Sequence, residues 1–186
     1  MKENLPNQLE KPKSGQTATE VIKLLINIIA GFLVPWIAGA FLIYWDKKAM
    51  LLAFPSGGFM SLLFNDFGVY TKWWQLHPDH MESVTTIPFN LGIYPIVAGW
   101  MLHFIFTTRF RFNAALMIAA FAALLTGAEF VYVCLDKIQY GNGWNIGWTY
   151  LSYILALGAV YGYSFMTSRR ILNGASRVGR PTRTSI

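Results

Sequence analysis

Two acidic side chains stand near the ends of long apolar stretches, where a carboxylate is costly to keep. Asp66 lies near the end of the second such stretch and Glu129 near the end of the fourth, while Asn90 lies near the start of the third. Ionisable groups at such positions usually face a protein interior or a water-filled cavity. We therefore expect Asp66, Asn90 and Glu129 to line one common pocket.

Two carboxylates that share a site of low dielectric titrate as a coupled pair, so one of them keeps its proton above its usual pKa. Such a pair can perform acid–base chemistry on an apolar substrate, which makes Asp66 and Glu129 the catalytic candidates. The same groups can instead bind a ligand together with Asn90, with Tyr70 or Trp144 near the mouth of the pocket. The spacing leaves both interpretations open.

A simpler interpretation stands beside the shared pocket. Each acid could be hydrated near the membrane surface, and Asn90 could join two helices by a hydrogen bond. Aromatic residues near the ends of the apolar stretches fit the belt that membrane proteins place at both interfaces. These residues are Tyr70, Trp73, Trp74, Tyr140, Trp144 and Trp148.

The loop between the second and third apolar stretches carries four residues of types that bind metals, His77, Asp79, His80 and Glu82. Their spacing matches no established metal motif, and Pro78 disfavours a helical face that would bring them together. The sequence therefore predicts no metal site and no cofactor.

The composition is that of a membrane protein. Of the 186 residues, 54% are hydrophobic and 13% are charged, whereas soluble domains carry about a quarter charged residues. The net charge of +6 comes from Lys and Arg residues at the edges of the apolar stretches and in the tail. Membrane topology explains that placement better than nucleic-acid binding does. We expect membrane lipid as a partner, and no nucleic acid.

Five apolar stretches are each long enough to cross a bilayer, which takes about 20 residues. They are residues 21–45, 50–70, 84–106, 112–135 and 144–166. The predicted fold class is all-α, an integral membrane bundle of five transmembrane helices. This bundle should occupy residues 21–168, between a flexible polar tail at residues 1–20 and a basic flexible tail at residues 169–186.

The distribution of Lys and Arg predicts the orientation of the chain. Five spans place the two termini on opposite sides, and the C-terminal side carries the larger share of basic residues. That side should be cytoplasmic, with the N-terminus outside. Asp66, Asn90 and Glu129 then all lie in the outer half of the membrane.

Small residues at helical spacing predict the faces on which the helices pack. One stripe is Gly57, Ser61, Asn65 and Gly68, and a second is Ala115, Ala119, Ala122 and Thr126, which leads to Glu129. Gly158 and Gly162 form a shorter pattern of the same kind. Because successive residues are about 100° apart on a helix, Asp66 falls at the margin of the first stripe.

A short internal repeat is also visible. Residues 66–70 (Asp-Phe-Gly-Val-Tyr) are similar to residues 129–132 (Glu-Phe-Val-Tyr), and each segment precedes a Trp-containing loop or helix start. Repeated pairs of helices are common in membrane transporters. The repeat would place Asp66 and Glu129 at equivalent positions.

Three groups of residues resemble those of a family of small, uncharacterised polytopic membrane proteins common in spore-forming bacteria. They are Asp66, Gly68 and Tyr70, then the Pro-Phe-Asn-Leu-Gly-x-x-Pro segment of residues 88–95, then Glu129 with Tyr140 and Trp144. The resemblance covers most of residues 24–166 and implies a bundle of about five spans in a bacterial cell membrane. It implies no particular activity. The family usually has proline after the glutamate, where this chain has Phe130, so the helix here should be straighter.

Three functions fit these observations. The first is the binding of a small molecule or lipid in the outer pocket, in one form as a transporter subunit, and because five spans are few for a transporter we then expect a homo-oligomer. The second is a membrane enzyme that acts on a lipid with Asp66 and Glu129 as acid and base. The third is a structural or assembly factor whose basic tail contacts anionic lipid or a cytoplasmic partner.

Overall fold

The computed structural model of the chain describes residues 21–22, 24–76, 82–107 and 113–178. Within these ranges the fold is all-α apart from one pair of three-residue strands, which confirms the predicted fold class. The predicted N-terminal tail and the loop residues His77, Asp79 and His80 lie outside the described residues.

Five long helical segments make up the described chain. The first joins a π-helical turn, η1 (Ile29–Leu33), to α2 (Val34–Trp45), and the second is α3 (Lys47–Tyr70). The third joins α4 (Glu82–Leu91) to α5 (Ile93–Thr107), the fourth is α6 (Ala114–Cys134), and the fifth is α7 (Ile146–Val178). Strand β1 (Trp74–Leu76) follows α3, and strand β2 (Ile138–Tyr140) follows α6.

Three of these helical segments are long and apolar enough to cross a membrane. They are Leu24–Trp45, Thr86–Thr107 and Ala114–Cys134. This finding is compatible with a membrane-embedded protein. With 24 and 33 residues, α3 and α7 are also long enough, but polar residues within them lower their mean hydropathy. The total of five spans therefore stays a prediction.

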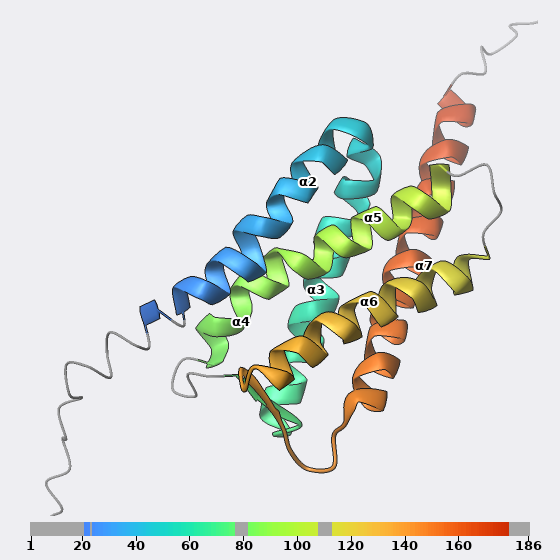
Figure 1. The fold of residues 1–186 in the computed structure, drawn as a ribbon. Helices are drawn as coiled ribbons and strands as arrows, with labels where there is room; N and C mark the ends of the chain where they lie inside the picture. The colour runs from blue at the N-terminus through green and yellow to red at the C-terminus, as the bar shows by residue number, and fades with distance from the viewer. Residues whose placement is uncertain (1–20, 23, 77–81, 108–112, 179–186) are drawn as a thin grey trace, which may run out of the picture.

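The helices are arranged so that four of them surround a common interior. Figure 1 shows α2, α5 and α6 sloping in the same direction, with α3 and α7 running across them at a steeper angle. Helix α3 packs against α5 and α7, and α7 also packs along α6. The core between these four helices is built from Ala49, Leu52, Ala53, Ala98, Met101, Leu102, Ala122, Leu125, Leu157 and Val160.

Glycine permits two close helix crossings. At the junction of α4 and α5, a Cβ on Gly92 would overlap the carbonyl oxygen of Gly31 and would lie 2.8 Å from Phe32 Cα. On α3, a Cβ on Gly57 would lie 3.0 Å from Pro95 Cα of α5. The lack of a side chain at these positions lets the backbones approach.

The small-residue stripe predicted on α3 is confirmed. Gly57, Ser61 and Gly68 are buried, and Asn65 is half-buried. Gly57 faces α5, as its neighbour Pro95 shows, and the hydroxyl of Ser61 donates to the carbonyl oxygen of Asn90 at 3.2 Å. This face of α3 therefore packs on the segment formed by α4 and α5.

Of the other two predicted packing patterns, the one on α6 is confirmed in part and the one on α7 is not. On α6, Ala122 is buried, but Ala115 near the start of the helix is exposed. On α7, no described atom lies within 4 Å of a Cβ built on Gly158 or Gly162. The prediction that these two glycines mark a close crossing is wrong, because the neighbouring helices contact α7 at other positions, such as Leu157.

Helices α3 and α6 end in the same way. Lys72 (φ 55°) and Asp136 (φ 52°) adopt the left-handed backbone conformation that commonly stops a helix. A short strand follows each of them, and β1 and β2 pair antiparallel with Gln75 opposite Gln139. Two loops that are far apart in the sequence are thereby joined at one end of the bundle, and we call this pair of strands the ribbon.

The matching ends of α3 and α6 show which residues of the internal repeat are equivalent. Asn65 lies six residues before Thr71, the residue that caps the end of α3, and Glu129 lies six residues before Leu135, which caps the end of α6. The position equivalent to Glu129 is therefore Asn65. The predicted equivalence of Asp66 and Glu129 is wrong by one residue.

The C-terminal boundary also differs from the prediction. Helix α7 continues to Val178, so it runs past residue 168 into the segment expected to be a flexible tail. The next proline after the apolar stretch is Pro181. Because proline is the strongest helix breaker, the absence of one before that point lets the helix extend beyond its apolar part.

Substitution of Asp46 should separate two contributions to the start of α3. Asp46 Oδ1 accepts a hydrogen bond from Ala49 N at 2.9 Å, and its Oδ2 lies 3.0 Å from His103 Nδ1. Asp46→Ala should lower the free energy of unfolding by about 1 to 2 kcal/mol, because the helix cap is lost. Asp46→Asn should lower it less, because asparagine caps equally well and only the contact with His103 is weakened. Thermal unfolding in detergent measures both, and equal losses in the two variants would contradict the capping role.

The same site predicts a loss of stability in acid. Partial burial opposes ionisation of Asp46, but the hydrogen bonds from His103 and from the Ala49 backbone outweigh it and hold the pKa below its ordinary value. A carboxyl with a lowered folded-state pKa stabilises the fold above its unfolded-state pKa, and this contribution disappears as the pH falls through the folded-state value. Asp46→Ala should therefore be less sensitive than the wild type to acidification below about pH 4. Equal sensitivity would contradict this assignment.

Candidate functional site

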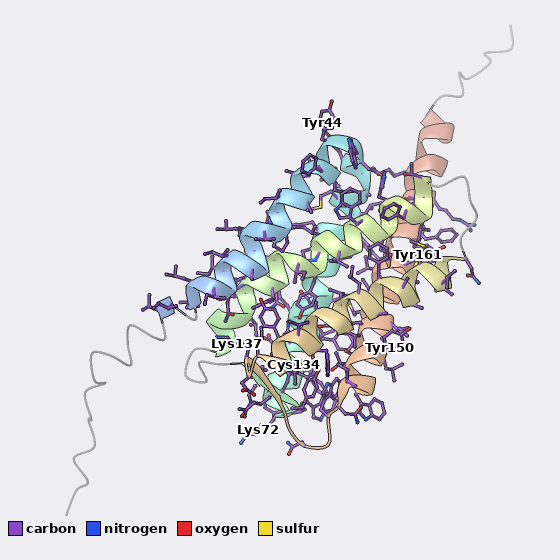
Figure 2. All side chains as sticks on the ribbon, in the orientation of Figure 1. Tyr44, Lys72, Cys134, Lys137, Tyr150 and Tyr161 are labelled. Carbon is purple, nitrogen blue, oxygen red and sulfur yellow. The ribbon has the colours of Figure 1, made fainter. Side chains whose placement is uncertain are left out.

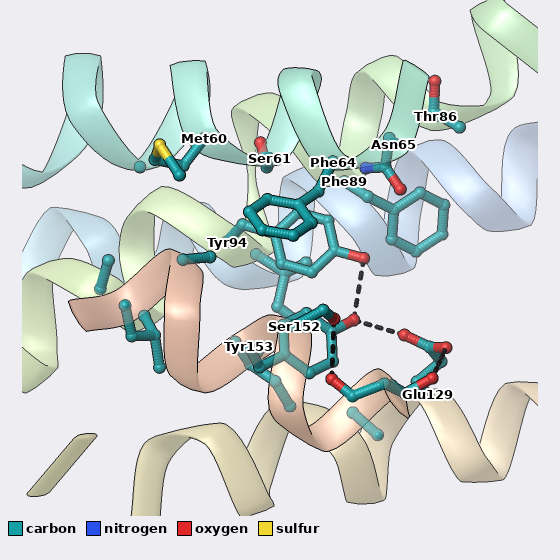
Figure 3. A pocket seen from close by; sticks show the side chains of 18 of the residues that line it. Met60, Ser61, Phe64, Asn65, Thr86, Phe89, Tyr94, Glu129, Ser152 and Tyr153 are labelled. Atoms are coloured by element: carbon teal, nitrogen blue, oxygen red, sulfur yellow. Dashed lines mark hydrogen bonds between the residues drawn. The ribbon is translucent and has the colours of Figure 1, made fainter. Parts of the chain in front are cut away.

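A cavity of about 90 Å³ lies between α3, α5, α6 and α7, next to the ribbon (Figure 3). Its polar lining gathers at the ribbon end, where Asn65, Tyr94, Glu129, Thr149 and Tyr153 lie. The deeper part is apolar and is lined by Gly57, Met60, Ala98, Leu125, Leu157 and Val160. The cavity thus has one polar end and one apolar end.

Glu129 is the centre of the polar end. The hydroxyl of Tyr140 donates to Oε1 at 2.7 Å, and the hydroxyl of Tyr153 donates to Oε2 at 2.5 Å. Thr149 Oγ1 lies 3.2 Å from Oε1 as well. One carboxyl group therefore connects α6 to both β2 and α7.

A chain of hydroxyl groups leads to this carboxyl from α5. Tyr94 Oη lies 3.3 Å from Tyr153 Oη, and Figure 3 shows Tyr94, Tyr153 and Glu129 joined in sequence. Because the single proton of Tyr153 is used in the bond to Glu129, Tyr94 is the donor to Tyr153. Hydroxyl groups can also turn and accept, so the chain accommodates Glu129 in either protonation state.

Trp144 orients the side chain of Thr149 in this network by a hydrogen bond. Its Nε1 donates to Thr149 Oγ1 at 2.8 Å, which leaves the proton of Thr149 for Tyr140 Oη at 3.0 Å or for Glu129. Tyr140 lies on β2, outside the helices. Burial and the nearby Glu129 carboxylate raise the pKa of Tyr140 above its usual range, so the phenol keeps its proton at neutral pH and remains a donor.

Three tryptophans close the ribbon end of the cavity, and we call them the tryptophan roof. The rings of Trp73 and Trp144 stack with centroids 4.5 Å apart, and the ring of Trp74 meets that of Trp144 edge-on at 5.0 Å. Trp74 is buried, lines the cavity and lies directly over Gly68, where a Cβ would overlap the indole ring. Glycine at position 68 is thus required for the roof to close on α3.

Two asparagines connect α3 to α4 beside the cavity. Asn65 Nδ2 donates to Asn90 Oδ1, and Asn90 is fully buried behind Asn65. Among the described residues, Asn90 Nδ2 has no hydrogen-bond partner. Asn90 therefore supports the cavity wall from behind, and Asn65 is the amide that lines it.

The predicted sharing of one pocket by two carboxylates is wrong. Asp66 is exposed and does not line the cavity, whereas Glu129 does. A turn of about 100° per residue explains the difference, because Asn65 faces inward and the next residue then points away. Tyr70 is also outside the cavity, with 86% of its surface exposed. Trp144 lies one layer back, in the roof.

The level of the polar groups in the bundle agrees with the prediction. Asn90 and Glu129 lie at the same end, next to the ribbon, and Asp66 is on the last turns of α3 at that end. Figure 2 shows Lys72 and Lys137 at the ribbon end and Tyr44 at the opposite end. The prediction was wrong about the direction in which individual side chains point around their helices.

Sequence reasoning missed Tyr94, Thr149 and Tyr153. Thr149 and Tyr153 are four residues apart on α7 and so share a face, and Tyr94 is four residues beyond Asn90. These spacings could have indicated polar faces directed at the predicted pocket. Nothing in the sequence showed that Thr149 and Tyr153 contact Glu129, or that Tyr94 is linked to it through Tyr153.

The fold and the cavity define a class of protein: an all-α bundle, compatible with a membrane, that encloses a pocket with one half-buried carboxyl group. Within the part of the chain that the structure describes, no three His, Cys, Asp or Glu side chains gather as metal ligands. No family model, no curated protein and no solved structure matches the chain. The family resemblance of residues 88–95 and Glu129 stays an expectation.

Proposed function

We propose that the chain is a multi-pass membrane protein that binds a small amphipathic molecule or lipid segment in the cavity beneath the ribbon. The observation that carries the proposal is the division of the cavity into two chemically different ends. The polar groups around Glu129 would hold a polar head, and the apolar end would hold a hydrocarbon body. Between Thr149 and Val160 the lining of α7 extends over about 16 Å, at 1.5 Å per residue.

The outer surface of the bundle supports five membrane spans. Helix α3 exposes Leu51, Phe59, Leu62, Leu63 and Phe67, and α7 exposes Leu151, Leu155, Tyr163, Phe165 and Met166. Soluble proteins rarely expose apolar surface of this extent. We infer that α3 and α7 lie in lipid with the three more apolar segments.

We propose a bacterial cell membrane as the location, with the ribbon outside and the C-terminus in the cytoplasm. Basic residues support this orientation, since Lys47, Lys48 and Arg169 lie at the end opposite the ribbon. The ribbon end carries Lys72 and Lys137. A transporter subunit that works as a homo-oligomer fits the same arrangement, and so does an assembly factor, but the cavity favours a binding role.

Filling the cavity tests the proposed function. Ala156 lines the cavity on α7, whereas Ala159 on the same helix is exposed and lies outside it. In detergent, 1-hexanol should raise the midpoint of thermal unfolding of the wild type and of Ala159→Phe, because a ligand that binds only the folded state stabilises it. Ala156→Phe should abolish this increase. An equal response of the two variants would contradict binding in the cavity.

A further inference from the structure

We propose that the ligand of this cavity is an organic cation, an alkylammonium ion whose charged nitrogen lies beside Glu129. This inference rests on the proposed function and specifies the chemistry of the polar end. Its starting point is the charge of the carboxyl group. The partners of Glu129 are the hydroxyl groups of Tyr140, Thr149 and Tyr153, all of which are uncharged.

No cation of the described chain neutralises Glu129. Among the basic side chains that the structure describes, His103 lies against Asp46 and Lys47, Lys48 and Arg169 lie at the end opposite the ribbon. Lys72 and Lys137 lie at the outer surface of the ribbon end. The equivalent position in the repeat is Asn65, an amide without charge. Because a carboxylate that is partly removed from water and has no partner ion is costly, a bound cation would stabilise the ionised form of Glu129.

The lining supplies a second feature that favours a cation. Six aromatic side chains contact the cavity: Phe64, Trp74, Phe89, Tyr94, Tyr132 and Tyr153. The faces of aromatic rings attract ammonium groups, most strongly where water is excluded. An anion would instead meet the carboxylate of Glu129 and the negative faces of these rings.

Hydrogen-bond capacity agrees with this assignment. A carboxylate offers about four lone-pair sites, of which three are directed at hydroxyl groups here. A primary ammonium ion carries three donors, which can reach the remaining site on Glu129 and the acceptor positions of Tyr94 and Tyr153. The apolar end of the cavity then takes the alkyl chain.

A pair of probes with the same chain tests the inference. Binding of hexylammonium and of 1-hexanol to the purified protein is measured at neutral pH by calorimetry, with hexanoate as the anionic probe. Hexylammonium should bind about tenfold more tightly than hexanol, a difference of about 1.4 kcal/mol, and hexanoate should bind most weakly. In Glu129→Gln, which keeps the hydrogen-bonding shape but not the charge, the preference for the cation should disappear.

The matched control is Asp66→Asn, which removes an exposed acid outside the cavity and should keep the full preference. Because detergent takes up the probes to different extents, the ratio of affinities is compared between variants. Equal binding of cation and alcohol to the wild type, or an unchanged ratio in Glu129→Gln, would overturn the cation assignment and leave the proposed function in place. If none of the probes binds the wild type, the proposed function itself fails. If Glu129→Gln does not fold, the comparison of hexylammonium with 1-hexanol on the wild type still tests the cation assignment.

Discussion

Replacing Gly92 by alanine is expected to lower the free energy of unfolding by about 3 kcal/mol, at the upper end of the usual cost of overpacking. A Cβ at this position would overlap the carbonyl oxygen of Gly31, and Phe32 Cα lies 2.8 Å away. Both obstacles are backbone atoms, which cannot turn aside as a side chain can. The first helical segment would have to separate from the junction of α4 and α5, and thermal unfolding in detergent should show a large decrease in midpoint.

Two other glycines provide the matched control. No described atom lies within 4 Å of a Cβ built on Gly127 of α6 or Gly158 of α7. Alanine at either position should leave stability unchanged or raise it slightly, because alanine favours a helix more than glycine does by up to about 1 kcal/mol. If Gly92→Ala unfolded at the same temperature as these variants, the close crossing at Gly31 would be disproved.

Removing the indole ring of Trp74 is expected to have an effect of similar size. The ring is 9% exposed, fills the space over Gly68 and contacts Trp144. Truncation of a buried tryptophan to alanine typically costs about 3 to 5 kcal/mol. The same change opens the ribbon end of the cavity to solvent, so Trp74→Ala should also weaken the binding of 1-hexanol.

Trp148 is the control for the roof. It lies near Trp144, with ring centroids 6.4 Å apart, but it is 52% exposed. Trp148→Ala should change stability by no more than about 0.5 kcal/mol and should leave hexanol binding intact. Similar losses in the two variants would show that the roof depends on the aromatic belt as a whole and not on the fit of Trp74 to Gly68.

The packed face of α3 and the importance of Glu129 could be predicted from the sequence because they depend on local patterns. The stripe from Gly57 to Gly68 identified the packed face of α3 by helical periodicity, and Glu129 was found because an acid within an apolar helix needs a cavity. Both inferences use only the residues of a single helix. The same reasoning failed for Gly158 and Gly162 of α7, because which face packs also depends on the neighbouring helices.

The errors arose where the direction of a side chain depends on a second segment. Asn65 and Asp66 are adjacent, and a shift of one residue decides which of them faces the cavity. The contact of Asn65 with Asn90 resolves this, but it joins residues of different helices. The ribbon was missed for the same reason, since Trp74 and Tyr140 pair across a long separation in strands of only three residues.

The antiparallel pairing of Gln75 with Gln139 gives the ribbon an approximate two-fold axis that passes between these two residues. A perfectly symmetric site would have the same residue at positions 65 and 129, so two glutamates would repel each other and two asparagines would provide no charge. The chain instead carries Asn65 on one side and Glu129 on the other. An asymmetric ligand in a symmetric site has two equivalent orientations, and the difference between these two positions helps to remove that degeneracy, as does Tyr153, whose equivalent position is Phe89. The negative charge of the cavity therefore lies on the α6 side of the ribbon end and not on the α3 side.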